Sequence, residues 1–264
     1  MPTDMQDDFE SEALLVRNSN LAPPNHYSFV VIVECTSDVF SSTGEYVPMS
    51  DYSHGVLVTL KHVLTLSHGI HPYPNREIQV TLSSGESISI TEDGIGLTYN
   101  RWAQSTRNQL LKQYEDVVIL TLPRRLSPQE VQPVALPRRA CLFRGLFVMS
   151  VARGETDDGV ILNNLYRVSL RRLNKYDCKR NYDSSKTGDV TTGKIICTSQ
   201  PPEMRISDRG APILYDSTIL AGINLVSLDK NTRKPDSPIN IHLNIYFIRR
   251  YIEMQIGDEY LREE

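Results

Sequence analysis

The sequence lacks any apolar run long enough to cross a bilayer, because none reaches the roughly 18 uninterrupted apolar residues that a membrane helix needs. Its first residues also lack the basic start and apolar core of a secretory leader. Acceptor sites of the Asn-x-Ser/Thr kind for N-glycosylation are absent as well. These absences predict a chain without a membrane span that is not exported by a leader of its own.

Strong net charge is absent too. The formal net charge of -4 argues against bulk attraction to nucleic acid or to an anionic membrane. The charge is nevertheless uneven, since residues 1–12 carry five acids and no base, and we expect residues 1–14 to form a disordered acidic leader. The stretch from Arg101 to Lys194 is rich in Arg and Lys. Such charges are usually solvated, but this basic middle segment leaves open a module that binds anionic partners.

Cysteine is scarce. The four cysteines, Cys35, Cys141, Cys178 and Cys197, are compatible with buried free thiols or with one or two bridges. We expect no metal site and no cofactor.

Short β-like runs dominate what is present. They are rich in Val, Ile, Tyr and Thr, and Gly, Pro, Asp and Ser separate them. Strands that recur without long helices between them indicate a β-sandwich or β-barrel. The predicted strands are Ser28–Cys35, Gly55–Thr65, Glu77–Leu82, Ser87–Thr91, Val117–Leu122, Leu146–Val151, Asn164–Leu170 and Ile213–Val226. Trp102–Tyr114 is predicted as a short helix or an extended loop, and Tyr246–Met254 as a closing amphipathic helix.

Three segments suggest a site. An apolar hairpin-like stretch ends at His68, Asp116 stands at the mouth of an apolar strand, and the turn Ser207-Asp208-Arg209-Gly210-Ala211-Pro212 enters another strand. These segments resemble the V-L-T-A-A-H-C, D-I-A-L-L and G-D-S-G-G-P-L patterns of chymotrypsin/trypsin-like serine proteases. They also follow one another in the order of that family: His, then Asp, then the nucleophile turn.

The resemblance extends over residues 15–256. Leu15-Val16 is similar to the mature N-terminus of the family, Val134–Pro137 to the crossing between barrels near residues 134–145, and Leu220–Ile223 to the strand after the nucleophile turn. It implies an all-β, chymotrypsin-like double six-stranded β-barrel with a C-terminal helix, followed by a polar tail at residues 257–264.

The resemblance implies that His68 is the general base position and that Asp116 is the acid that orients it. The nucleophile position is occupied by Arg209. A guanidinium stays protonated and offers no usable lone pair, so it cannot attack a carbonyl. We expect Arg209 to reach an acid, with Asp116 the natural candidate, or to fill the substrate cleft.

The residues around this position depart from the family pattern as well. Ser207 and Ala211 replace glycines of the oxyanion turn, while Asp208 persists in that turn. Glu203 falls near the base of the specificity pocket, where it is either a pocket acid or a surface acid. No Arg or Lys precedes Leu15 to mark an activation cleavage. The resemblance also implies a Cys178–Cys197 disulfide and leaves Cys35 and Cys141 free or mutually bonded.

Taken together, these residues predict a catalytically inactive serine protease homologue that acts by binding, as a decoy, cofactor or regulator of a protease or peptide partner. Two alternatives stay open: an atypical serine endopeptidase with residual activity, for which Ser207 is the only hydroxyl of the turn, and the anion-binding module. The family resemblance implies an extracellular protein, whereas the missing leader and scarce cysteines favour a cytoplasmic one.

Overall fold

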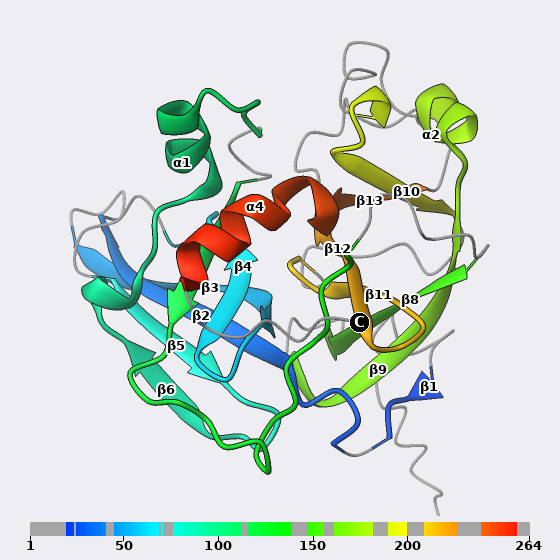
Figure 1. Cartoon of the computed structure of the whole chain (residues 1–264). Helices are drawn as coiled ribbons and strands as arrows, with labels where there is room; N and C mark the ends of the chain where they lie inside the picture. Colours follow the sequence, from blue (N-terminus) through cyan, green and yellow to red (C-terminus); the bar gives the residue numbers. More distant parts are fainter. Residues whose placement is uncertain are drawn as a thin grey trace, which may run out of the picture.

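A computed structural model describes two β-sheets and four helical elements in this chain. It describes residues 20–23, 25–40, 45–68, 70, 76–111, 116–138, 147–155, 161–181, 190–199, 209–225 and 239–257. Figure 1 shows the two sheets side by side, the first coloured blue to green and the second mainly yellow-green to orange, with the red C-terminal helix lying across them. The predicted leader, residues 1–14, and residues 258–264 of the predicted tail lie outside the described residues.

The first sheet has six strands in the order β6-β5-β2-β3-β4-β7. Its central strands are runs of β-branched and other apolar residues, and four of the five residues of β7 are fully buried. These strands form a half-barrel around a shared apolar core. Their bounds are β2 (Val30–Phe40), β3 (Tyr46–Leu57), β4 (His62–Leu66), β5 (Glu77–Thr81), β6 (Ser87–Ile90) and β7 (Val117–Thr121).

The second sheet has the order β1-β9-β10-β13-β12-β11-β8, and an additional β8–β9 pairing closes six of its strands into a barrel. All pairings of this sheet are antiparallel, and every residue of β12 is buried. The bounds are β1 (Asn20–Leu21), β8 (Phe147–Glu155), β9 (Ile161–Arg172), β10 (Ile195–Ser199), β11 (Pro212–Tyr215), β12 (Ile219–Leu225) and β13 (Ile239–Asn244).

Two helices fasten the sheets together. α4 (Ile245–Ile256) begins directly after β13 of the second sheet, and the Asn244 side chain caps it by accepting from the Tyr246 N–H at 3.1 Å. It packs on α1 (Tyr99–Thr106), which belongs to the first half of the chain, through rings that include Tyr99 and Tyr251, with centroids 5.6 Å apart. The Tyr251 hydroxyl donates to the Leu97 carbonyl at 2.7 Å, so α4 bonds directly to the first half of the chain. The remaining helical elements are α2 (Lys175–Asn181) and the 3-10 turn η2 (Glu92–Gly94).

The structure confirms the predicted fold class and most predicted strands. The closing helix is also confirmed, whereas the predicted Trp102–Tyr114 helix starts three residues earlier and ends at Thr106. Thr98 caps α1 at its start, and Arg107 ends it in the left-handed conformation, with a φ of 57°. The short elements β1, β10, β13 and α2 were not predicted, and β3 was predicted only from Gly55 onward. The predicted strand Ile213–Val226 is divided into β11 and β12. In the described part of the chain, no helix is long and apolar enough to cross a membrane.

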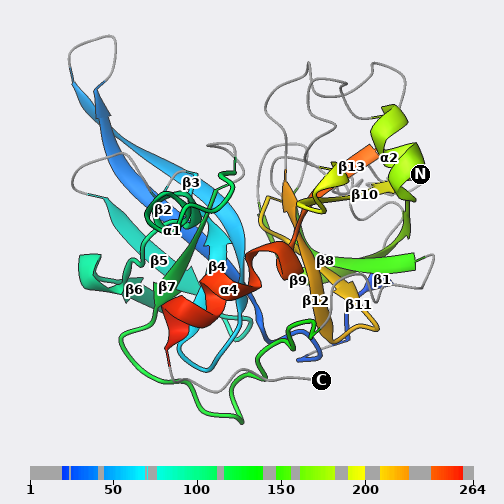
Figure 2. The same cartoon turned by 45° about the horizontal axis from the view of Figure 1, so that its top comes forward.

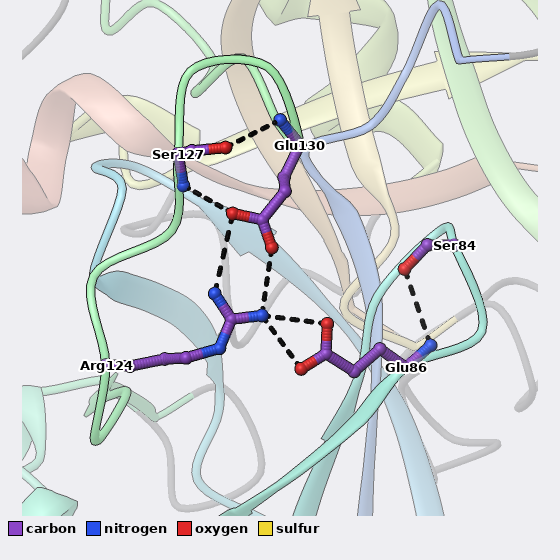
Figure 3. Close-up of polar contacts among 5 residues, drawn as sticks. All are labelled: Ser84, Glu86, Arg124, Ser127 and Glu130. Atoms are coloured by element: carbon purple, nitrogen blue, oxygen red, sulfur yellow. Dashed lines mark hydrogen bonds and ion pairs between the residues drawn. The ribbon is translucent and has the colours of Figure 1, made fainter.

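An exposed ion-pair network fastens the turn after β7 to the β5–β6 hairpin (Figure 3). One nitrogen of the Arg124 guanidinium lies 2.8 Å from both carboxylate oxygens of Glu86 and 2.9 Å from Glu130. Glu130 also accepts from the Ser127 N–H at 2.6 Å. Arg124, followed by the Ser127 donors, lowers the pKa of Glu130 from 4.5 to about 2.

We expect this network to make the stability of the chain depend on pH in acid. Because the pKa of Glu130 is lower in the folded state, its contribution is present above about pH 4.5 and is lost as the pH falls toward about 2. A Glu130→Gln variant should therefore melt below the wild type near neutral pH and converge with it as the pH falls to about 2. Melting curves across this range test the prediction. Glu92→Gln, at an exposed acid outside the network, is the control and should leave the pH dependence unchanged.

Candidate functional site

His68 and Asp116 lie at the ends of two neighbouring strands. β4 and β7 are paired with Leu66 opposite Val117, and the Ser67 N–H donates to the Asp116 carbonyl at 2.9 Å. This pairing brings the two predicted site residues to one end of the first sheet. Together they line a cavity of about 230 Å³, whose other lining residues are Ser67, Thr98, Asn100, Arg101 and Gln104.

The Asp116 carboxylate is buried and already well supplied with donors. It accepts from the backbone N–H of Asn100 at 2.9 Å and of Val117 at 3.0 Å. The side chains of Thr98 and Ser67 also favour its charged form. Burial raises the pKa of Asp116, and the two backbone hydrogen bonds and these side chains oppose that rise. Among the described residues none of its donors is a histidine, so the carboxylate is held by α1 and its own strand.

Arg209 binds a different acid from the one expected. Its Nη2 atom forms an ion pair with Asp51 of β3 and donates to the Tyr52 carbonyl at 3.1 Å. The prediction that Arg209 pairs with Asp116 is wrong. The Asp116 carboxylate accepts hydrogen bonds from neighbouring residues, and Asp51 of β3 lies next to Arg209. The Arg209 side chain is only 6% exposed and that of Asp51 is 35% exposed, so the pair joins a buried cation to a partly hydrated anion.

The backbone at Arg209 is fixed against β3. The His54 N–H donates to the Arg209 carbonyl at 2.7 Å, and the Gly210 N–H donates to the Asn224 carbonyl at 3.0 Å. Gly210 has a φ of +79°, and a Cβ at this position would lie 2.1 Å from the His54 carbonyl oxygen. The turn therefore requires glycine for two reasons, its left-handed conformation and its close approach to β3.

These contacts cover the outer edge of β3. Hydrogen-bonded pairs alternate along an antiparallel ladder, and the Leu57 N–H donates to the Phe29 carbonyl at 2.8 Å. Residues with even numbers on β3 therefore direct their backbone groups away from β2. At Tyr52 the carbonyl accepts from the Arg209 side chain, and at His54 the N–H donates to the Arg209 carbonyl. Arg209 thus occupies two positions at which an extended peptide would add to this edge.

Solved structures share this architecture. HL collagenase matches with a TM-score of 0.64 at 15% identity, covering 92% of this chain and 99% of that one. The scabies mite inactivated protease paralogue S-D1 matches with a TM-score of 0.65 at 13% identity over 93% and 99% of the two chains. Paralogue S-I1 matches with a TM-score of 0.63 at 16% identity over 90% and 98%. This chain has the chymotrypsin fold. No family model and no curated protein matches it.

In this chymotrypsin fold the imidazole of His68 stands in an unfavourable place for a positive charge. Burial lowers the pKa of His68, and the Arg209 cation lowers it further, while Asp51 partly opposes them. A general base must hold the proton that it takes, so both causes weaken His68 in that role.

Some of the predicted site residues lie outside the described residues: Glu203, Ser207 and Asp208. The residues of β3 that contact Arg209, namely Asp51, Tyr52 and His54, were not predicted as site residues. One signal was available. Asp51 is one of only four charged residues between Tyr27 and Leu60, and all four are acids.

The predicted disulfide is present. Cys178 of α2 and Cys197 of β10 are bonded, with Cα atoms 5.6 Å apart. Cys35 is a buried free thiol, so it does not bond to Cys141, which lies outside the described residues. In this fold the bridge fastens α2 to the second barrel.

We expect replacement of both bridged cysteines by serine to lower the free energy of unfolding by about 3 kcal/mol. This is the free-energy equivalent of the entropy that the unfolded chain regains when a loop of this length is no longer closed. Urea unfolding of the Cys178→Ser/Cys197→Ser variant, with and without a reductant, measures it. The matched control is Cys35→Ser, which removes a thiol but no bridge. The account of the bridge fails if reductant destabilises the wild type and the double variant equally.

Proposed function

We propose that this chain is a non-catalytic serine protease homologue that acts by binding. The observation that carries the proposal is the state of Arg209, which stands where the family has its nucleophile. Its guanidinium pairs with Asp51 and covers the edge of β3.

The chemistry of acyl transfer supports this proposal. The reaction needs a hydroxyl or thiol that an imidazole can deprotonate, and a guanidinium supplies neither. Loss of the nucleophile alone costs a factor on the order of a million in related enzymes. Arg209 also disfavours the imidazolium of His68. One substitution thus removes the attacking group and opposes the proton transfer.

The comparisons are consistent with an inactive homologue. Two of the matched structures are inactivated protease paralogues from the scabies mite, while another is a collagenase. The same fold therefore hosts both activity and its loss, and the proposal rests on the site residues.

We infer a protein or peptide as the partner, and an extracellular setting. The Cys178–Cys197 bridge favours an oxidising compartment, where such bonds persist. Decoy, cofactor and regulator are all roles that a protease-shaped surface without turnover can fill.

Hydrolysis assays test the proposal. We expect the wild-type chain to cleave neither a nitrophenyl ester nor a mixture of fluorogenic peptides above the buffer rate. His68→Ala should give the same trace, and Ser207→Ala tests the only hydroxyl of the turn. Activity that disappears in either variant would show a working enzyme and overturn the proposal. Trypsin, assayed in parallel, is the positive control.

A further inference from the structure

The β2–β3 hairpin reaches far beyond the rest of its sheet. The two strands pair continuously from Val30 opposite Val56 to Phe40 opposite Tyr46. β5 accompanies β2 only as far as Thr36, and β4 accompanies β3 only over residues 55–57. Residues 37–40 and 45–50, here called the arm, therefore form a two-stranded ribbon, which Figure 2 shows projecting away from both sheets.

The arm exposes apolar side chains on both of its faces. Every residue from Glu45 to Ser50 is exposed. Tyr46 is 72% exposed, and on the opposite face Met49 and Val47 are 55% and 48% exposed. Several neighbouring exposed apolar groups on one ribbon mark an interaction surface more than scattered single ones do.

The charge of the arm has one sign. Between Tyr27 and Leu60 the sequence has no Lys or Arg, and its four charged residues, Glu34, Asp38, Glu45 and Asp51, all lie on the hairpin. Asp51 pairs with Arg209, which comes from the second half of the chain, and the segment itself contributes only negative charge. A surface that combines carboxylates with apolar and aromatic groups is complementary to basic side chains with apolar neighbours.

The partner is expected to bind through side chains, because the backbone edge is unsuited to adding a strand. Pro48 has an even number on β3, so it lies where an outward N–H would be needed and it has none. Further along the same edge Arg209 takes the Tyr52 carbonyl and the His54 N–H. Strand addition along β3 is therefore interrupted at three positions.

The base of the arm is fixed. The ion pair of Arg209 with Asp51 ties the second barrel to β3 just below Ser50. A projecting ribbon that is held at its base loses less freedom on binding than a free hairpin would. Arg209, at the position where the family has its nucleophile, thus also restrains the base of the arm.

We propose that the arm is the docking surface of this protein, and that its partner is a protein segment rich in arginine or lysine and apolar side chains. This inference rests on the proposed function, since it names the surface through which a non-catalytic homologue binds.

A defined peptide tests the surface. The probe is a fluorescein-labelled peptide of four Arg-Leu-Ser repeats, compared with Glu-Leu-Ser and Arg-Ser-Ser repeats, and binding is measured by anisotropy at low salt. We expect the Arg-Leu-Ser peptide to bind most tightly. Asp38→Lys/Glu45→Lys and Val47→Ser/Met49→Ser should each weaken it at least about tenfold. The matched controls, Glu92→Lys/Asp93→Lys and Leu97→Ser/Met254→Ser, make the same changes at other exposed positions and should bind as the wild type does.

Three results would overturn the inference. One is equal binding by the arm variants and their controls, and another is equal affinity for the three peptides. The third is concentration-dependent self-association in sedimentation velocity that the arm variants abolish, because the arm would then bind a second copy. Mass spectrometry of the recovered peptide separates the two proposals: cleaved peptide contradicts the proposed function, whereas intact peptide with arm-independent binding contradicts only the docking surface.

Discussion

Gly210→Ala is expected to destabilise the fold more than any other single methyl addition among the described glycines with positive φ. The new Cβ would lie 2.1 Å from the His54 carbonyl oxygen, in a residue whose φ is +79°. Backbone strain of this kind costs about 1 to 3 kcal/mol, and forcing β3 away from the turn adds about 1 to 3 kcal/mol. Urea unfolding should therefore show a loss of more than about 3 kcal/mol.

Two other glycines separate the conformational cost from the steric one. Gly85 and Gly193 also have positive φ, +89° and +78°, but no atom lies within 4 Å of an added Cβ. Their alanine variants should lose only about 1 kcal/mol. If all three variants lose the same free energy of unfolding, the close contact between Gly210 and the His54 carbonyl of β3 has no effect on stability, and our description of this turn is wrong.

Removal of the Arg209 cation is expected to cost about 2 kcal/mol of stability, less than the 3 to 5 kcal/mol typical of fully buried pairs. The expected cost is smaller because the Asp51 side chain is 35% exposed, so water can hydrate its carboxylate once Arg209 is replaced. Arg209→Met keeps most of the apolar stem of the side chain, so the variant isolates the charge and its hydrogen bonds.

A double-mutant cycle with Asp51→Asn measures the pair itself. We expect the two changes to be coupled by about 1 kcal/mol or more, because the side chains are in direct contact. Arg101→Met, at an exposed arginine, should change stability by no more than about 0.5 kcal/mol. Strict additivity of Arg209→Met and Asp51→Asn would mean that the ion pair contributes nothing.

Most of the fold could be predicted from local patterns. The apolar runs of β4 and β7 and the amphipathic period of α4 are strong signals, because each element buries a continuous face. β10 was missed because it is a five-residue strand between long polar stretches, and β13 because it follows a polar stretch and runs directly into α4. Their strand character comes from pairing with each other as neighbours in the sheet, which local sequence does not encode.

The structure brings the predicted residues His68 and Asp116 to one cavity, but the contacts of the candidate residues could not be predicted. His68, Asp116 and Arg209 were placed by their order along the chain. The pairing of Arg209 with Asp51 joins residues 158 positions apart and depends on how close β3 comes to the turn. The Asn100 N–H that donates to Asp116 lies in the first turn of α1, which the predicted helix, beginning only at Trp102, did not include. Sequence patterns carry residue types well and long-range geometry poorly.

The central claim is the absence of a nucleophile, and covalent labelling tests it most directly. The wild-type chain is incubated with a fluorophosphonate, which reacts with activated serine hydroxyls, and its intact mass is then measured beside trypsin treated in the same way. The account predicts no mass increase for this chain and complete labelling of trypsin. A stoichiometric adduct on this chain that is lost in His68→Ala would contradict it.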